Sequence, residues 1–185
     1  MKGETHNVVA LVGDGALSGG EAFEGLNNAA VLGSNIILII NDNDMSIAEN
    51  HGGLYQNLRL LRETDGKAAC NFFQAMGFDY FFVRDGNDFN EIADALEKVK
   101  NKNHPVVIHM CTVKGKGYQF AEADKENWHY MEPFDVHTGK LRHEAAPVET
   151  YEALTAAYLA DKMKKDPAIT AVTAGTPKVL GFGKE

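Results

Sequence analysis

Two short polar clusters, each following an apolar run, constrain this sequence more than any other feature. Gly-Asp-Gly at residues 13–15 follows the run at 7–12, and Asn-Asp-Asn at 41–43 follows the run at 35–40. One helix-length segment separates them, which predicts two parallel strands joined by a helical crossover. Because parallel strands end at the same edge of a sheet, both clusters are expected to share one ligand-binding edge.

The side chains of these clusters are suited to a hard divalent cation. Asp14 supplies a carboxylate and Asn43 an amide oxygen, and Mg²⁺ prefers such oxygen ligands. A six-coordinate ion would add the backbone carbonyl of Met45, diphosphate oxygens and a water. Taken alone, Asp14 or Asn43 could simply be a turn residue, because Asp and Asn favour turns. Their pairing across one crossover favours a metal-diphosphate site.

Other phosphate-binding motifs fit this segment less well. A dinucleotide fingerprint would need its third glycine at position 18, where the chain has Ser18, and no P-loop pattern occurs. Ser18 can instead cap a helix predicted over residues 20–31, with Glu21 reaching back in a capping box. The amino end of that helix would favour a diphosphate beside Asp14.

Strands and helices alternate along the 185 residues. Short apolar runs predict strands at 7–12, 35–40, 80–83, 106–112 and 169–173. Helical stretches lie at 20–31, 66–76, 88–100 and 150–164. This alternation predicts an α/β fold with a mostly parallel sheet and helices on both faces.

The domain organisation follows from where this regularity stops. Residues 114–148 lack periodicity, as functional loops and linkers do. We therefore expect residues 1–144 to form one domain that lacks its amino-terminal part. Residues 145–185 are expected to form a linker and the start of a truncated second domain.

Composition limits the partners and the setting. The net charge of −8 and the lack of a basic stripe argue against broad nucleic-acid binding. No apolar run is long enough for a membrane span, so we expect a soluble protein without membrane partners. Cys70 and Cys111 lack metal-type spacing and are interpreted as reduced packing residues. They favour a cytoplasmic setting.

At this spacing the two clusters resemble the thiamine diphosphate motif of transketolase-like enzymes. Within that group, residues 15–24 and 43–50 resemble the 1-deoxy-D-xylulose-5-phosphate synthases, as do 114–118, Trp128-His129 and 133–135. The similarity spans most of residues 7–140. The family has a longer connection than residues 50–80 provide, and its Asp-Gly-His is Asp-Gly-Asn at 85–87. These differences fit a shortened branch of the family or a transketolase-like relative.

The resemblance implies the thiamine diphosphate-binding fold, with thiamine diphosphate and Mg²⁺ as cofactors. Its pyrimidine-binding domain would begin at residues 169–177. By spacing alone His129 is an ordinary surface or packed residue, but the resemblance gives it a catalytic role near the substrate. The implied cofactor-binding residues are Gly13, Asp14, Gly15, Ala16, Asn43, Met45 and Tyr118, and the implied metal ligands are Asp14, Asn43 and Met45.

The activity that the resemblance implies is a carboligation. Pyruvate would lose CO₂ and join glyceraldehyde 3-phosphate to give 1-deoxy-D-xylulose 5-phosphate, a precursor of isoprenoids and thiamine. Alternatives are a transketolase-type ketol transfer between sugar phosphates, or the cofactor-binding half of a split two-subunit enzyme. The family's amino-terminal histidines and activating glutamate have no counterpart in these residues. The chain alone is therefore expected to be inactive, and the full-length protein to be a homodimer.

Overall fold

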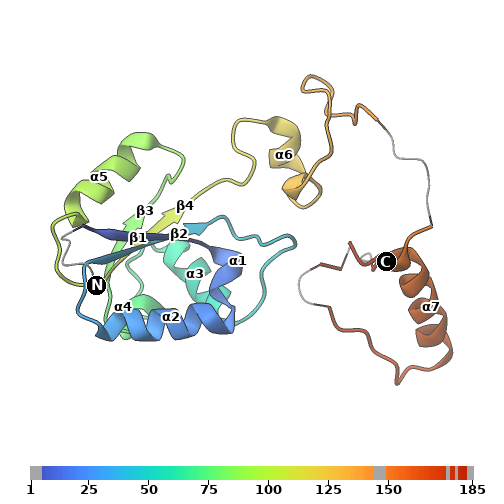
Figure 1. Ribbon diagram of the computed structural model, residues 1–185, viewed down its shortest axis with the longest axis horizontal. Coiled ribbons are helices and arrows are strands. Elements are labelled where there is room, and N and C mark those ends of the chain that lie inside the picture. Colours follow the sequence, from blue (N-terminus) through green and yellow to red (C-terminus); the bar gives the residue numbers. More distant parts are fainter. Residues whose placement is uncertain (1–5, 144–148, 174–175, 178, 183–185) are drawn as a thin grey trace.

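A four-stranded parallel sheet organises the first part of the chain, which lies at the left of Figure 1. The computed structural model describes residues 6–143, 149–173, 176–177 and 179–182. The strands lie in the order β1-β2-β4-β3 and comprise β1 (Val8–Gly13), β2 (Ile36–Asp42), β3 (Asp79–Val83) and β4 (Val106–Cys111). The predicted α/β fold with a parallel sheet is confirmed.

Helices connect and flank these strands. They are α1 (Asp14–Leu17), α2 (Gly20–Val31), α3 (Gly53–Glu63), α4 (Phe72–Ala75), α5 (Phe89–Val99), α6 (Gln119–Ala123), the 3₁₀ helix η1 (Asn127–His129) and α7 (Tyr151–Lys165). The predicted helices at 20–31, 88–100 and 150–164 are confirmed to within one residue at each end. None of the helices in the described ranges combines the length and the apolar character that crossing a membrane requires.

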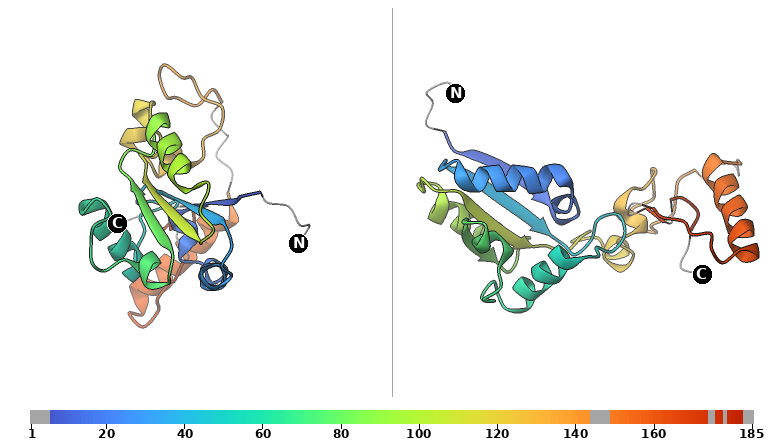
Figure 2. Two further views of the ribbon diagram at one scale, coloured as in Figure 1. Left: turned by 90° about the vertical axis from the view of Figure 1, so that its left-hand side faces the viewer. Right: turned by 90° about the horizontal axis from the view of Figure 1, so that it is seen from below.

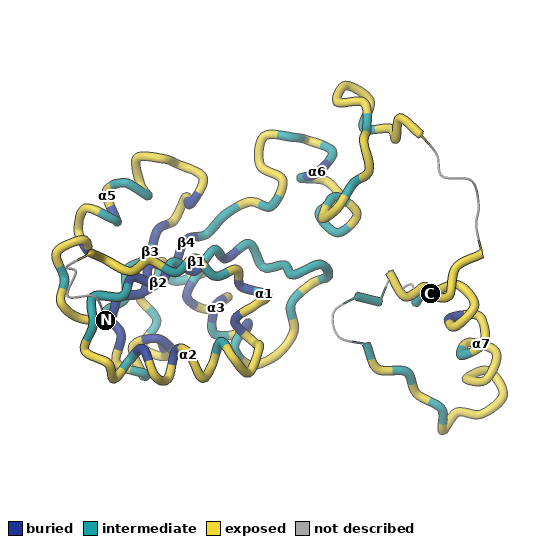
Figure 3. The backbone as a smooth tube through the Cα atoms, in the orientation of Figure 1, coloured by how far each residue is buried: buried dark blue, intermediate teal, exposed yellow. Residues whose placement is uncertain are grey.

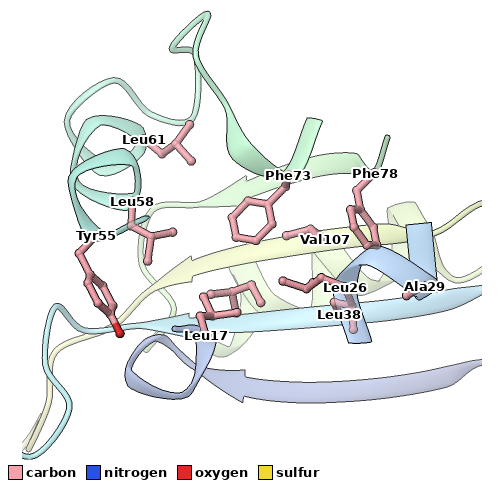
Figure 4. Close-up of a cluster of buried hydrophobic side chains, with 11 residues drawn as sticks. Leu17, Leu26, Ala29, Leu38, Tyr55, Leu58, Leu61, Phe73, Phe78 and Val107 are labelled. Carbon is pink, nitrogen blue, oxygen red and sulfur yellow. The ribbon is translucent and has the colours of Figure 1, made fainter. Parts of the chain in front are cut away.

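The larger apolar core lies between one face of the sheet and α1 to α4 (Figure 4). Alternate residues of a strand point to opposite faces, so Leu38 of β2 and Val107 of β4 share this core. Helix α3 contributes Tyr55, Leu58 and Leu61, all buried at helical spacing. This packing sets α3 beside the carboxyl ends of β2 and β4.

The second core lies on the opposite face, beneath α5. It joins Ile37 and Ile108 of the sheet to Ala95 and Val99 of the helix. The prediction of helices on both faces is therefore confirmed. Edge strand β1 is less covered on this face, where Leu11 is 69% exposed.

The helix predicted over residues 66–76 is mostly wrong. Gly66 has a φ of +71°, a left-handed conformation that interrupts a helix. The Asn71 side chain then accepts hydrogen bonds from the backbone N–H groups of Phe73 and Gln74, which caps α4. Only residues 72–75 are helical, whereas α3 upstream was not predicted although its buried residues follow a helical period.

Two further expectations are corrected. The predicted strand at 169–173 is irregular, because no neighbouring strand among the described residues pairs with it. The capping box at Ser18 and Glu21 does not form. Gly19 is the N-cap of α2 without a side-chain hydrogen bond, and Ser18 Oγ instead accepts from the Tyr55 hydroxyl at 2.8 Å.

The segment after β4 extends beyond the carboxyl ends of the strands (Figure 2). There α6 and η1 are held by contacts among the rings of Tyr118, Phe120, Trp128 and Phe134. Helix α7 is mostly exposed along its length (Figure 3). Residues 114–148 were predicted to be irregular. Their described part contains two short helical turns, α6 and η1, which pack on this aromatic cluster.

Candidate metal and diphosphate site

Asp14 lies at the carboxyl edge of the sheet, where β1 ends and α1 begins. It is 1% exposed. Burial, and then the negative charge of Asp42, raise its pKa to about 6, while the backbone N–H groups of Gly15, Met45 and Asn43 act against the rise. The parallel pairing of β1 with β2 thus brings Asp14 together with the turn that carries Asn43 and Met45.

The turn after β2 has a defined local structure. The Asn43 side-chain oxygen accepts a hydrogen bond from the backbone N–H of Met45 at 3.2 Å, which is the Asx turn that asparagine favours. Asp44 between them has a φ of +63°, which is uncommon for a residue other than glycine. Aspartate adopts this conformation more readily than most residues, because its short polar side chain can bond locally.

Asn50 is a site residue that the sequence reasoning did not single out. Its side-chain amide donates to Asp14 Oδ2 at 2.9 Å. The residue lies in the segment 43–50 that carries the family resemblance, so a signal for it was present. The bond orients the Asp14 carboxylate, and an ionised carboxylate keeps further lone pairs for a cation.

Gly15 lies in close contact with the loop after β2. A Cβ atom built at Gly15 would be 2.7 Å from both Cβ and Oγ of Ser46, so a larger residue requires the loop to move. Ala16, one residue further, is exposed, as is Gly13. The structure therefore brings the Gly-Asp-Gly turn directly against the Asn43–Ser46 turn.

A cavity of about 380 Å³ opens beside these residues. Its walls come from α1, the loop after β2 and the start of α3. Tyr55 closes one side, with its hydroxyl also 3.3 Å from the Gly15 carbonyl. The lining residues are Gly15, Ser18, Ser46, Ala48, Glu49, Asn50, His51 and Tyr55.

Asp42, the last residue of β2, is held in a buried polar network. Its Oδ2 lies 2.7 Å from His109 Nε2, and Arg62 Nη1 donates to both carboxylate oxygens at 2.7 Å. Burial raises the Asp42 pKa, but the hydrogen bonds from His109 and Arg62 outweigh burial and hold it below its ordinary value. The Tyr80 hydroxyl lies 2.7 Å from the other His109 nitrogen, Nδ1.

His129 lies in η1, beyond the strand ends, and contacts the site through Lys114. Lys114 Nζ is 3.0 Å from His129 Nδ1 and also donates to the Ser46 carbonyl. Burial lowers the Lys114 pKa, against the charge of Asp14. His129 also lines a smaller cavity of about 270 Å³ with Ile47 and Asn127. Through Lys114 and Ser46, the structure connects His129 to the Gly15 turn.

Tyr118 is placed differently from the other predicted site residues. Its hydroxyl donates to the Val136 carbonyl at 3.1 Å, and its ring contacts Phe120, Trp128 and Phe134. In the described part of the chain, these hydrogen-bond and ring contacts all lie within residues 118–136. The structure therefore gives Tyr118 a packing role in the aromatic cluster and does not connect it directly to Asp14.

The donor set at the sheet edge fits a magnesium diphosphate group. It combines a buried carboxylate, a neighbouring amide oxygen and the carbonyls of an irregular backbone, which are all hard oxygen ligands. Gly15, which lacks a side chain, lines the adjoining cavity at this point. These residues could therefore hold Mg²⁺ together with a diphosphate.

Comparison with solved structures defines the class of fold. The chain is similar to transketolase from Campylobacter jejuni, with a TM-score of 0.50 and 28% sequence identity over 65% of this chain and 18% of the transketolase. The architecture, with its candidate site at the carboxyl edge of a parallel sheet, is that of the thiamine diphosphate-binding α/β fold.

Sequence comparison then narrows the class. The family model described as 1-deoxy-D-xylulose-5-phosphate synthase matches residues 1–71 and 62–112. Enzymes of that name from Listeria monocytogenes serotype 4b and Myxococcus xanthus are 38% and 39% identical over 96% and 94% of this chain. The chain belongs to the 1-deoxy-D-xylulose-5-phosphate synthase family.

The matches also show how much of a relative the chain represents. It spans about 30% of the Listeria enzyme and 35% of one from Caldanaerobacter subterraneus subsp. tengcongensis. The second alignment runs over 218 positions, at 36% identity, so that relative has extra residues within the matched region. The family match is broken near residues 62–71, which places the shortened connection between α3 and α4.

Proposed function

We propose that this chain forms the metal- and diphosphate-binding part of a thiamine diphosphate-dependent transferase. The reaction is the joining of pyruvate, with loss of CO₂, to glyceraldehyde 3-phosphate, giving 1-deoxy-D-xylulose 5-phosphate. One observation carries the proposal: buried Asp14 lies against the Asn43–Met45 turn at the carboxyl edge of the sheet, in a chain of the synthase family.

Each part of the site has a separate task in this proposal. Asp14 and Asn43 would hold Mg²⁺ by their side chains and Met45 by its carbonyl, while Gly13, Gly15 and Ala16 border the diphosphate. When bound, thiamine diphosphate supplies a carbon nucleophile and an electron sink for the chemistry at the keto carbon. In this proposal Mg²⁺ would anchor and orient the diphosphate rather than act at the reacting carbon.

His129 would act on the substrate side of the site. A lysine ammonium can only donate hydrogen bonds, so Lys114 at 3.0 Å makes His129 Nδ1 an acceptor. A neutral His129 then carries its proton on Nε2. From that atom it could donate a hydrogen bond to an oxygen that becomes negative as the keto group reacts, and such a bond would stabilise the developing charge.

The test is CO₂ release by the intact protein of which this chain is part. Carboxyl-labelled pyruvate is supplied with thiamine diphosphate and Mg²⁺, with and without glyceraldehyde 3-phosphate. Release that depends on the aldehyde, and disappears in an Asp14→Asn variant, is the expected result. A protein that binds the cofactor but releases no CO₂ would contradict the synthase reaction.

In that case ketol transfer between sugar phosphates would be the better assignment, and the similarity to a transketolase structure supports testing it with ketose phosphate donors. We also expect the intact protein to be a cytoplasmic homodimer, as the family resemblance implies. Sedimentation equilibrium of the purified protein checks the dimer, and a monomer at micromolar concentration would contradict it.

A further inference from the structure

The turn that carries Asn43 is held from both sides by a single side chain. The Arg62 guanidinium donates from Nη1 to Asp42 at 2.7 Å and lies 2.8 Å from Asp44 through Nη2. Asp42 and Asp44 are the residues immediately before and after Asn43. A planar guanidinium fixes the orientation of two acceptors at once, which a lysine ammonium does not.

The Asp42 end of this arrangement is fixed by two further strands. His109 of β4 and Asp42 of β2 have fully buried side chains, 2.7 Å apart. Tyr80 of β3 lies against the far side of the His109 ring. Because every polar atom in this row has a partner, the Asp42 carboxylate has one orientation rather than several.

The Asp44 end needs such support for a different reason. Its φ of +63° is uncommon for a residue other than glycine, although aspartate adopts it more readily than most, and such a conformation is kept where its surroundings fix it. Asp44 N–H donates to Asp42 Oδ1 at 3.1 Å, and Arg62 holds the Asp44 carboxylate. Asp44 is therefore fixed to the same buried carboxylate.

We propose that Arg62 and His109 are positioning residues that hold the Asn43–Met45 turn in the geometry needed for metal binding. This inference rests on the proposed function, because it assigns a task to residues that do not contact the cofactor themselves. Partners that orient metal ligands in this way commonly change metal affinity by about 10–100-fold when they are replaced.

A competing interpretation of the same cluster is a second metal site. Ligand atoms of Asp42, His109 and Cys111 lie within 4.8 Å of one another. Both Asp42 oxygens already accept hydrogen bonds from the Arg62 cation, and His109 Nε2 faces Asp42. A cation there would be repelled by Arg62 and would have to displace these bonds, so the cluster is better explained as a support for the neighbouring turn.

The experiment compares two substitutions of Arg62 in the intact protein. Arg62→Lys keeps the charge but loses the two-sided contact, and Arg62→Gln loses both. Thiamine diphosphate binding is measured by calorimetry over a series of Mg²⁺ concentrations. We expect the Mg²⁺ concentration for half-saturation to rise about 10–100-fold in both variants, with cofactor affinity recovering at saturating Mg²⁺.

The matched control is Arg59→Gln on the same helix. The Arg59 side chain is 60% exposed and reaches Asp44 only at 4.0 Å, so we expect less than a twofold change in Mg²⁺ half-saturation, as for weak surface pairs. A second test replaces His109 by Gln, whose amide can still donate to Asp42, and by Leu, which cannot. The glutamine variant is expected to retain more of the metal affinity.

Each outcome has a defined meaning. Folded Arg62→Lys and Arg62→Gln proteins with the wild-type Mg²⁺ half-saturation would overturn the positioning role and leave the cofactor site intact. Loss of near-ultraviolet dichroism in both would also overturn it, because the effect would then be on the fold as a whole. Failure of the wild-type protein to bind thiamine diphosphate with Mg²⁺ would overturn the proposed function and this inference together.

Discussion

Lys114 and His129, fifteen residues apart in the sequence, meet through a contact of 3.0 Å between Nζ and Nδ1. The same ammonium donates to the carbonyl of Ser46, which lies against Gly15. One lysine therefore connects the segment that carries His129 to the turn that faces the proposed diphosphate site.

This contact predicts that the two residues act as a unit. We expect Lys114→Met and His129→Ala each to lower kcat about 100–1,000-fold with little change in cofactor affinity, since the loss of one donor to a developing oxyanion costs that much. The double variant should lose little more than either single variant, because coupled residues are not additive. Lys116→Met, at an exposed lysine in the same loop, is the control. A double variant whose loss of kcat equals the product of the two single losses would contradict the coupling.

Gly15 provides a steric prediction. In Gly15→Ala the new methyl would lie 2.7 Å from Ser46 Cβ, so we expect a loss of about 1–3 kcal/mol in the free energy of unfolding, typical of overpacking, and weaker cofactor binding. Ser46→Gly in the same protein should restore part of both. Gly25→Ala in α2, where nothing lies within 4 Å, should instead stabilise by about 0.5–1 kcal/mol. Urea unfolding measures the free energy of unfolding of each variant. Equal changes in Gly15→Ala and Gly25→Ala would exclude the steric clash with Ser46.

The raised pKa of Asp14 predicts a dependence of stability on pH in the metal-free protein. Its carboxyl titrates near pH 6 when folded but near its ordinary value of 3.8 when unfolded. The folded state therefore binds more protons between these values, and the stability contributed by Asp14 falls as pH rises through this window. A shift of about two pH units amounts to about 3 kcal/mol.

Urea unfolding of the wild-type protein and Asp14→Asn at pH 4 and pH 7 measures this contribution. The difference between the two proteins should change by up to about 3 kcal/mol in favour of the variant at pH 7. Groups that do not interact with Asp14 cancel in that difference. Stability curves that stay parallel over this range would show that Asp14 is not protonated abnormally in the fold.

Metal removal gives a further expectation. Chelation of Mg²⁺ should abolish thiamine diphosphate binding by the intact protein, and added Mg²⁺ should restore it. Asn43→Ala removes one proposed ligand and should raise the Mg²⁺ requirement at least about tenfold. Asn90→Ala, at an exposed position on α5 across the sheet, is the matched control. Cofactor binding that persists in excess chelator would rule out the assigned metal role of Asp14 and Asn43.

Much of the fold could be predicted from local patterns. Helix α2 has the predicted bounds of residues 20–31 because its apolar spacing and adjacent glycines act within a few residues. The two polar clusters at the ends of β1 and β2 were expected to meet, since parallel strands place their carboxyl ends on one edge. By contrast, the prediction of a helix over 66–76 did not take account of Gly66 and of the Asn71 cap. These two residues limit helix α4 to four residues.

By itself the sequence determined the α/β class, the edge of the sheet where the candidate site lies, and Asp14 and Asn43 as neighbours, because strand alternation and polar residues at strand ends are local signals. Only the tertiary structure revealed that Arg62 holds both residues beside Asn43, that His109 is buried against Asp42, and that Lys114 meets His129. These contacts join residues from different elements, and their geometry depends on how helices and strands pack rather than on spacing along the chain.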